Sequence, residues 1–181
     1  MKNGVVPIQV FGVIPTSRGC AVFVGNEEKT FTIYVELSVG QAIAMFMQGT
    51  PKERPYTHDL IGHVFNGLGV SVQRVVINDL KNGTYFARLI LKQENELGQK
   101  ILEVDARPSD CLALAIQAKA PIFVARTVFE EVEDMSEVLK KLNEMQGEIG
   151  PESELENPPK SNPDVDEPGP EEEEPPEGSK G

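Results

Sequence analysis

The sequence predicts a single α+β domain, built from two related units of three strands and a helix, with a mixed or antiparallel sheet. Three observations predict it. Short β-branched segments alternate with segments that have helical signals, which is typical of strands and helices packed into one core. The order strand, strand, strand, helix occurs twice along the chain. A length of 181 residues suits one ordinary domain with an appendage.

Each element is predicted from its local pattern. The expected strands cover 5–14, 21–24, 31–35, 70–77, 85–91, 101–104 and 122–124, with Val128 as a further strand residue. Within 31–35, period-two spacing puts alternate apolar residues on one face. Asn82-Gly83 predicts a tight hairpin between the fourth and fifth strands.

Helices are predicted where capping residues precede apolar periodicity. The expected helices cover 42–47, 57–68, 112–116 and a C-terminal segment from Ser136 through Leu142. Ser38 to Gln41 has the form of a capping box, and Thr57 is the predicted N-cap of the second helix. The helix 112–116 is apolar almost all round, which predicts that it is buried. The apolar stripe predicted for the second helix consists of Leu60, Ile61, Val64, Phe65 and Leu68.

The two halves also align by residue identity. A shift of 69 positions places Val35 on Val104 and Gln48 on Gln117. It also aligns Glu36 with Asp105. The identities are few, but the matched order of elements predicts an internal duplication.

The acidic charge lies mainly at the C-terminus. The net charge is −12, and residues 147–181 hold twelve acidic residues and two lysines, which leaves −2 for residues 1–146. Eight of the 14 prolines also lie beyond Gly147. We therefore expect a domain over 1–146 and a disordered, acidic, Pro/Glu-rich tail over 147–181. The nearly neutral domain offers no basic patch for a polyanion.

Cysteine usage and hydropathy indicate a reducing cytoplasm. Cys20 and Cys111 are too few and too distant in sequence for a disulfide framework or a metal knuckle. No apolar run approaches membrane-spanning length, and the N-terminus lacks the apolar core of a secretion signal. We expect a cytoplasmic protein that does not associate with a membrane.

Two polar clusters, 54–59 and 105–110, could carry chemistry. Each places an arginine and at least one carboxylate at a predicted helix N-terminus, where free N–H groups can hold a phosphate. Carboxylates at such a point could bind Mg²⁺ or Mn²⁺, a combination that suits phosphodiester hydrolysis. His58 is the only imidazole in either cluster and the first candidate for proton transfer.

The same residues also have structural interpretations. Thr57 and Ser109 are ordinary N-cap types, and an aspartate such as Asp110 is favoured in a first helical turn by the helix dipole. Arg107 could pair with Asp105 or Asp110 as a clamp.

The spacing of Asp59 and His63 would let them share a metal, but surface pairs at this spacing are common. There is no phosphate-cradling glycine loop, nucleophile elbow or paired CxxC. The residue pattern alone therefore leaves the metal unknown and predicts no particular reaction.

At these two clusters the sequence resembles the bifunctional nuclease domain family. The segments that carry the resemblance are 54–60, 75–89, 105–115 and 120–124, and with their surroundings they cover most of residues 5–132. The resemblance implies an α+β domain with nuclease action on DNA and RNA, so nucleic acid is the expected partner. The polar positions that it carries over are Arg54, His58, Asp59, Asp105, Arg107, Ser109 and Asp110.

The leading hypothesis is that both clusters converge on a phosphodiester. The expected catalytic residues are His58, Asp59, Asp105 and Asp110, and the expected substrate-binding residues are Arg54, Arg107 and Ser109. The arginines hold phosphate, the aspartates supply metal or general-base carboxylates, and His58 transfers protons.

One departure from the family concerns the first-half hinge. A glutamate common in the family corresponds to Val39 here, and Glu36 is its only nearby substitute. The predicted site therefore uses little of the segment 36–51. The alternative hypothesis is a non-catalytic binding or regulatory module, as a homodimer, with both polar clusters in structural roles. Well-separated and locally satisfied Asp59 and Asp110 would favour that alternative.

Overall fold

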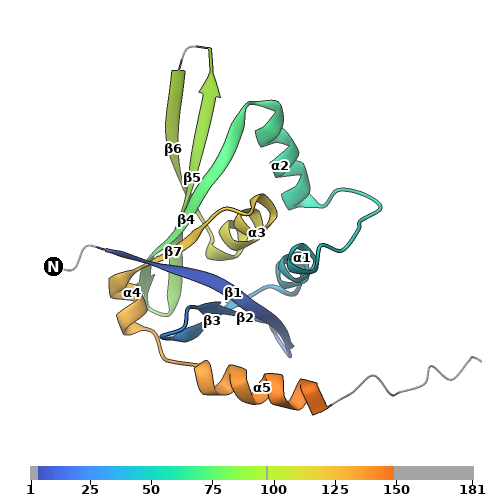
Figure 1. The fold of residues 1–181 in the computed structure, drawn as a ribbon, viewed down its shortest axis with the longest axis vertical. Helices are drawn as coiled ribbons and strands as arrows, with labels where there is room; N and C mark the ends of the chain where they lie inside the picture. Colours follow the sequence, from blue (N-terminus) through green and yellow to red (C-terminus); the bar gives the residue numbers. More distant parts are fainter. Residues whose placement is uncertain (1–3, 97, 149–181) are drawn as a thin grey trace, which may run out of the picture. The chain divides into compact units, whose positions relative to one another are not determined.

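A computed structural model of the chain describes residues 4–96 and 98–148, which form a seven-stranded mixed sheet with helices packed against it (Figure 1). The strands are β1 (Val5–Thr16), β2 (Gly19–Gly25), β3 (Thr30–Val35), β4 (Val70–Lys81), β5 (Thr84–Asn95), β6 (Gly98–Ala106) and β7 (Ile122–Ala125). The helices are α1 (Leu37–Gln48), α2 (Thr57–Gly67), α3 (Pro108–Ala118), α4 (Arg126–Glu131) and α5 (Ser136–Glu148). The tail predicted for 147–181 lies outside the described residues except for the end of α5, so its boundary and its disorder stay predictions.

Two antiparallel meanders make up most of the sheet. The strand order is β3-β2-β1-β7-β4-β5-β6, and β7 joins the meanders by pairing antiparallel with β1 and parallel with β4. The predicted α+β class and mixed sheet are confirmed. The two units run β1-β2-β3-α1 and β4-β5-β6-α3, which is the repeated order that the sequence predicts.

The structure refines the alignment between the units. The N-caps of α1 and α3 are Glu36 and Arg107, 71 positions apart, and their left-handed C-caps are Gly49 and Lys119, 70 apart. The ends of the two helices therefore do not follow the shift of 69. A common origin of the units stays a prediction.

The hairpin between β4 and β5 forms at the predicted residues. Asn82 and Gly83 both have positive φ, at 50° and 75°. This is the backbone of a type I′ turn, which matches the twist of the flanking strands and favours Asn-Gly.

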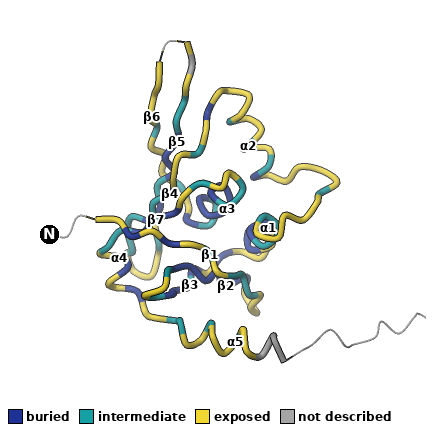
Figure 2. The backbone as a smooth tube through the Cα atoms, viewed as in Figure 1, coloured by how far each residue is buried: buried dark blue, intermediate teal, exposed yellow. Residues whose placement is uncertain are grey.

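Helices α1, α2 and α3 pack against the sheet and against one another. Helix α1 packs on β1 and β2, helix α3 packs on β4 and β5, and the two helices contact each other. Helix α2 packs on α3 and β4. Burial concentrates in β2 and α3, as the dark segments of Figure 2 show, so the prediction of a buried helix after the second polar cluster is confirmed.

The predicted N-caps are wrong by one or two residues. The N-caps are Glu36, Tyr56 and Arg107, none of which forms a side-chain capping hydrogen bond. Thr57 and Ser109 lie in the first helical turn. Pro108 explains the start of α3, because its fixed φ suits the first helical residue and leaves the preceding residue extended.

The capping box predicted at Ser38 does not form, because α1 begins at Leu37 and leaves Ser38 inside the helix. The C-terminal helix begins at Ser136 itself. There the Asp134 carboxylate accepts hydrogen bonds from both the backbone N–H and the hydroxyl of Ser136.

One strand prediction is wrong, and the apolar stripe predicted for the second helix is only partly buried. Val128 is in helix α4 instead of a strand, and one helical turn lets it pack in the core together with Phe129. On α2, the side chains of Leu60, Val64 and Leu68 are exposed, while the neighbouring side of the predicted stripe packs against the core.

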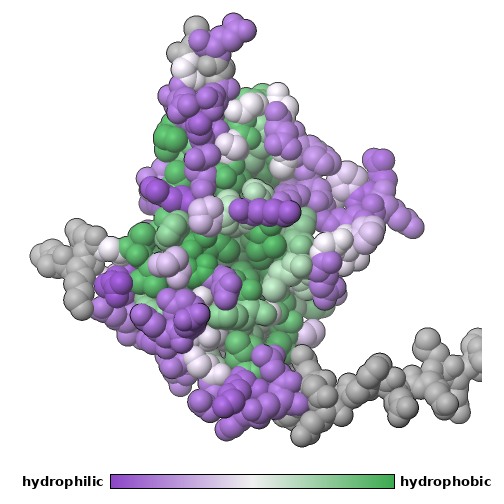
Figure 3. Space-filling view, in the orientation of Figure 1, coloured by the Kyte–Doolittle hydropathy of each residue, from purple (hydrophilic) through white to green (hydrophobic). Residues whose placement is uncertain are grey.

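On the face seen in Figure 3, hydrophobic residues spread across the centre, with hydrophilic residues over α5 and the far end of β5–β6.

Candidate functional site

A pocket of about 810 Å³ lies where the N-terminal parts of α1, α2 and α3 meet. Its lining residues are Glu36, Ser38, Val39, Gln41, Ala42, Met45, Pro55, Tyr56, Thr57, His58, Ile61, Arg107 and Asp110. About half of them come from α1 and its N-cap. The prediction that the first-half hinge contributes little is therefore wrong, because the contact between α1 and α3 brings that segment to the second hinge.

His58 and Asp110 meet inside this pocket although they are 52 positions apart in the sequence. The Nε2 atom of His58 lies 3.1 Å from Oδ1 of Asp110. His58 is only 7% exposed, and its ring meets the ring of Phe46 edge-on at 6.4 Å between centroids. The carboxylate and the aromatic contact hold the imidazole in one orientation. Nδ1 has no hydrogen-bond partner among the residues that the structure describes.

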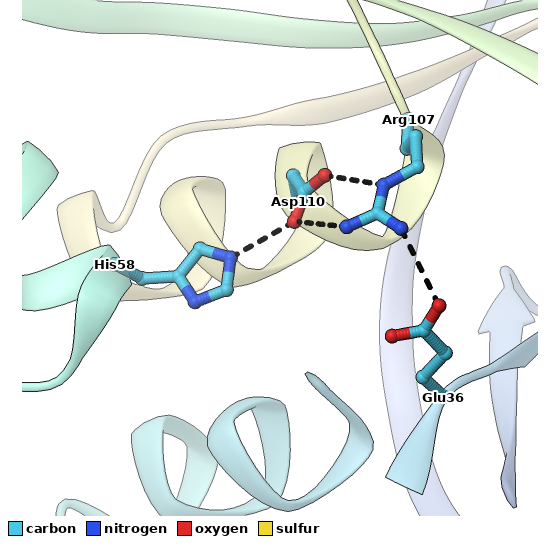
Figure 4. Close-up of polar contacts among 4 residues, drawn as sticks. All are labelled: Glu36, His58, Arg107 and Asp110. Carbon is cyan, nitrogen blue, oxygen red and sulfur yellow. Dashed lines mark hydrogen bonds and ion pairs between the residues drawn. The ribbon is translucent and has the colours of Figure 1, made fainter. Parts of the chain in front are cut away.

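Arg107 and Glu36 extend this pair into a chain of four polar side chains (Figure 4). Arg107 donates from Nε to Oδ2 of Asp110 at 2.8 Å and from Nη2 to Oδ1 at 3.4 Å. Its Nη1 lies 3.7 Å from Oε1 of Glu36. Arg107 is half-exposed or more, so its guanidinium remains reachable from the pocket.

The electrostatics of the chain keep Asp110 ionised. Partial burial would raise the pKa of Asp110, but hydrogen bonds from Arg107 and His58 and the charge of Arg107 outweigh burial and bring the pKa below its usual value. The hydrogen bond to Asp110, together with its charge, raises the pKa of Arg107 further. The pocket therefore holds a permanent carboxylate and a permanent guanidinium beside the imidazole.

A comparison with models of known families identifies the family of this chain. The model of the bifunctional nuclease domain matches residues 22–137, which is more than half of the chain and includes His58, Arg107 and Asp110. The chain belongs to the bifunctional nuclease domain family.

Two relatives of this bifunctional nuclease domain protein are uncharacterized proteins from two strains of Mycobacterium tuberculosis. Each is 37% identical over 106 residues, which cover 59% of this chain and 60% of the relative. The matched segment thus spans less than two thirds of either relative. Among the helices that the structure describes, none is long and apolar enough to cross a membrane.

Asp59 does not line the pocket. Its hydrogen bonds connect α2 to the preceding linker and to α3. Its carboxylate accepts hydrogen bonds from Lys52 Nζ at 2.7 and 2.9 Å, from Gln117 Nε2 at 2.9 Å and from the Tyr56 backbone N–H at 2.9 Å. Lys52 also lies 3.7 Å from the centre of the Phe46 ring, which touches His58. Asp59 is therefore placed to position His58, its chain neighbour. The direct catalytic role expected for Asp59 stays a prediction.

The other predicted site residues do not line the pocket. Asp105 is on β6 and forms an ion pair with Arg88 at 3.3 Å. Ser109 lines a neighbouring hollow that Arg107 also lines. Arg54 is exposed beside Pro55 at the pocket margin. Of the seven predicted residues, the pocket lining includes His58, Arg107 and Asp110.

Sequence patterns did not single out several residues that build the site. Gln117 reaches Asp59 from 58 positions away, which no local spacing signals. Lys52 and Phe46 precede their partners Asp59 and His58 by only 7 and 12 positions, but their contacts depend on how the linker and α1 pack against α2. Tyr56, which is half-exposed at the pocket, did carry a signal, because it lies between Arg54 and His58 in the polar cluster 54–59.

The donor set of the pocket does not fit a divalent cation. Both oxygens of Asp110 accept hydrogen bonds from the cationic Arg107, and Nε2 of His58 faces the same carboxylate. Within residues 4–96 and 98–148, no group of three or more His, Cys, Asp or Glu residues could hold a metal. In the described part of the chain, the partners of the Asp59 carboxylate are Lys52, Gln117 and the Tyr56 N–H, and no contact with His63 is seen.

A stability prediction follows from the Asp59 network. Burial would raise the pKa of Asp59, but its hydrogen bonds from Lys52, Tyr56 and Gln117 lower it below the usual value. A depressed pKa stabilises the fold above the unfolded-state pKa of about 3.9, and this contribution is lost as the pH falls through the folded-state pKa. We expect Asp59→Asn to reduce the free energy of unfolding by about 1–2 kcal/mol at pH 7, with a smaller deficit at pH 3.

Urea unfolding at pH 7 and pH 3 checks this expectation. Glu53→Gln, which neutralises an exposed carboxylate in the same linker, is the matched control and should leave the free energy of unfolding unchanged. A deficit for Asp59→Asn that is equal at both pH values would contradict the ionised role of Asp59.

Proposed function

We propose that this bifunctional nuclease domain hydrolyses phosphodiester bonds of DNA, RNA or both in the pocket between α1, α2 and α3. One observation carries the proposal: a carboxylate-bound histidine lies beside an accessible arginine in a pocket formed by helix N-termini. This combination supplies a proton-transfer group and a phosphate-binding group within one cavity.

His58 is the proposed proton-transfer group. Asp110 holds Nε2, which leaves Nδ1 for a water molecule placed in the pocket. As the water oxygen forms its bond to phosphorus, Nδ1 accepts a water proton. The ester P–O bond then breaks, and the leaving oxygen receives a proton from solvent. Asp110 fixes the ring orientation and stabilises the imidazolium that forms, as a carboxylate does in a catalytic triad.

Arg107 is the proposed phosphate-binding group. A guanidinium presents several N–H donors in a plane that matches two phosphate oxygens. To bind the substrate, Arg107 exchanges its contact with Glu36 for one with phosphate while it keeps its shorter bond to Asp110. Arg54 adds positive charge at the margin, and Asp59 positions His58. No step in this mechanism uses a metal.

The alternative function is a non-catalytic binding module, and one observation favours it. Both oxygens of Asp110 already accept hydrogen bonds from protein donors, as expected of a structural clamp. A binding module would retain its affinity for nucleic acid but would not cleave it.

A cleavage assay decides between these functions. Purified protein is incubated with single- and double-stranded DNA and RNA, with and without Mg²⁺ or Mn²⁺, and compared with a His58→Ala/Asp110→Ala double variant. We expect the wild-type protein to cleave and the double variant to be slower by about 10²–10⁴-fold, the usual contribution of general acid–base catalysis. His63→Ala is the matched control, because His63 is on the same helix but outside the pocket. Equal rates for the wild-type protein and the double variant would overturn the proposal.

A further inference from the structure

The candidate pocket continues into two further hollows. The second hollow, about 340 Å³, shares Glu36 and Arg107 with the pocket. The third, about 410 Å³ beside the β1–β2 turn, shares Tyr34 and Val35 with the second. Shared walls make the three hollows neighbours in a row, each of a volume found in ligand sites. The row extends from the N-terminus of α2, past Arg107, to Arg18.

Tyr34 separates the second and third hollows and exposes its ring to solvent. It lies on β3 between Ile33 and Val35, whose side chains are buried, so period two directs the Tyr34 side chain away from the core. The residue is 72% exposed. Among the described residues, its ring stacks on no other aromatic ring and faces no cation. An aromatic face left free in a groove can stack on a planar ligand.

Cationic groups lie on both sides of Tyr34. Arg107 lines the second hollow, and Arg18 lines the third, where its guanidinium has no ion-pair partner among the described residues. Glu131 and Glu133 line another hollow that also touches Tyr34. Their charge disfavours an anionic chain on that side, so a polyanion that passes Tyr34 is directed toward Arg18.

We propose that Tyr34, Arg18 and Arg107 form a second subsite that binds the nucleotide next to the scissile phosphodiester of a single-stranded nucleic acid. This inference rests on the proposed function of the pocket. The base stacks on Tyr34, and its flanking phosphates contact the two arginines. The strand is single because only an unpaired base offers its face to an aromatic side chain.

Glu36 controls access between the pocket and this subsite. Its carboxylate is exposed, lines both hollows and lies 3.7 Å from Arg107. It therefore competes with a phosphate for the same guanidinium. Neutralising Glu36 should strengthen binding, whereas removing either subsite cation should weaken it.

Binding measurements test the subsite separately from cleavage. The probe is a fluorescein-labelled single-stranded oligonucleotide, and its Kd is measured by fluorescence anisotropy in the His58→Ala background, which leaves the strand intact. We expect Tyr34→Ala to raise Kd by roughly 5- to 150-fold, as loss of one stacked base does. Tyr34→Phe should retain wild-type Kd, and Glu36→Gln should lower it. A double-stranded probe should show no effect of Tyr34→Ala.

The salt dependence of Kd tests the proposed contact between Arg18 and a phosphate. Arg18→Ala should reduce the slope of log Kd against log salt by about 0.7, the value for one phosphate contact on a single strand. Arg74→Ala removes the same charge from an exposed position on β4 outside the three hollows and serves as the matched control. Arg74→Ala should leave the slope unchanged.

The outcomes separate this inference from the proposed function. Unchanged Kd in Tyr34→Ala overturns the subsite, even if the wild-type protein cleaves nucleic acid. Equal weakening by Tyr34→Ala and Tyr34→Phe also overturns stacking on the ring. Failure of the wild-type protein to cleave any nucleic acid overturns the proposed function, while a Kd that still depends on Tyr34 supports the subsite as a binding site.

Discussion

Removing Asp110 from a protein that already lacks His58 is expected to cause almost no further loss of cleavage. His58→Ala alone should lower kcat/KM by about 10²–10⁴-fold, because it removes the proton-transfer group. Asp110→Ala alone should also cause a large loss, because Asp110 acts through the ring that it orients at 3.1 Å. Residues that act as one unit give strongly non-additive losses.

Rates of single-stranded DNA and RNA cleavage for the two single variants and the double variant check this expectation. Thermal unfolding of each variant is measured in parallel, since loss of Asp110 also leaves Arg107 without its nearest partner. Added imidazole should partly restore cleavage in His58→Ala and should not act on the wild-type protein. Losses that multiply in the double variant would show that the two residues act independently, against the proposed mechanism.

The sequence predicted most of the fold because most of its signals are local. The Asn82-Gly83 turn follows from backbone conformations that those two residue types tolerate. The strands follow from alternation, and the burial of α3 follows from a helix that is apolar almost all round. Each signal lies within one element and does not depend on what the element packs against.

The errors occur where tertiary contacts decide the outcome. The exposed side chains of Leu60 and Val64 belong to a stripe that looks buried in the sequence, but α2 contacts its neighbours through a narrower face. The contribution of α1 to the pocket depends on its packing against α3, which no pattern within 36–51 reveals. The start of α3 is different, since Pro108 carries a local signal for an N-cap at Arg107 that the prediction of Ser109 did not use.

In the candidate site, too, local signals predicted some features, whereas tertiary contacts decided others. His58, Arg107 and Asp110 were predicted as site residues because they lie at predicted helix N-termini. The structure brings those three together. The same chemistry selected Asp59 equally, because residue type does not distinguish a carboxylate that faces a pocket from one that faces Lys52. Only the packing of α2 on α3 separates their roles.

Gly40→Ala is expected to destabilise the domain more than any surface substitution, because α1 approaches β2 through this glycine. A Cβ at Gly40 would lie closer than 3.0 Å to both Cβ and Sγ of Cys20, which is 2% exposed. Real Cβ atoms essentially never approach other atoms so closely. The side chain on β2 cannot move away in a packed interior, so α1 must shift. Overpacking of this kind costs about 1–3 kcal/mol, or roughly 2–12 °C in Tm for a chain of this size.

Thermal unfolding of Gly40→Ala beside Gly67→Ala checks the cause. Gly67 is also helical, but nothing lies within 4 Å of a Cβ there, so its replacement should leave stability unchanged or raise it by up to about 1 kcal/mol. Because Gly40 donates its N–H to the carbonyl of Glu36, a shift of α1 also moves the pocket wall that faces Arg107. Cleavage should therefore fall in Gly40→Ala at temperatures where the protein remains folded. Wild-type stability in Gly40→Ala would show that α1 does not pack on Cys20 this closely.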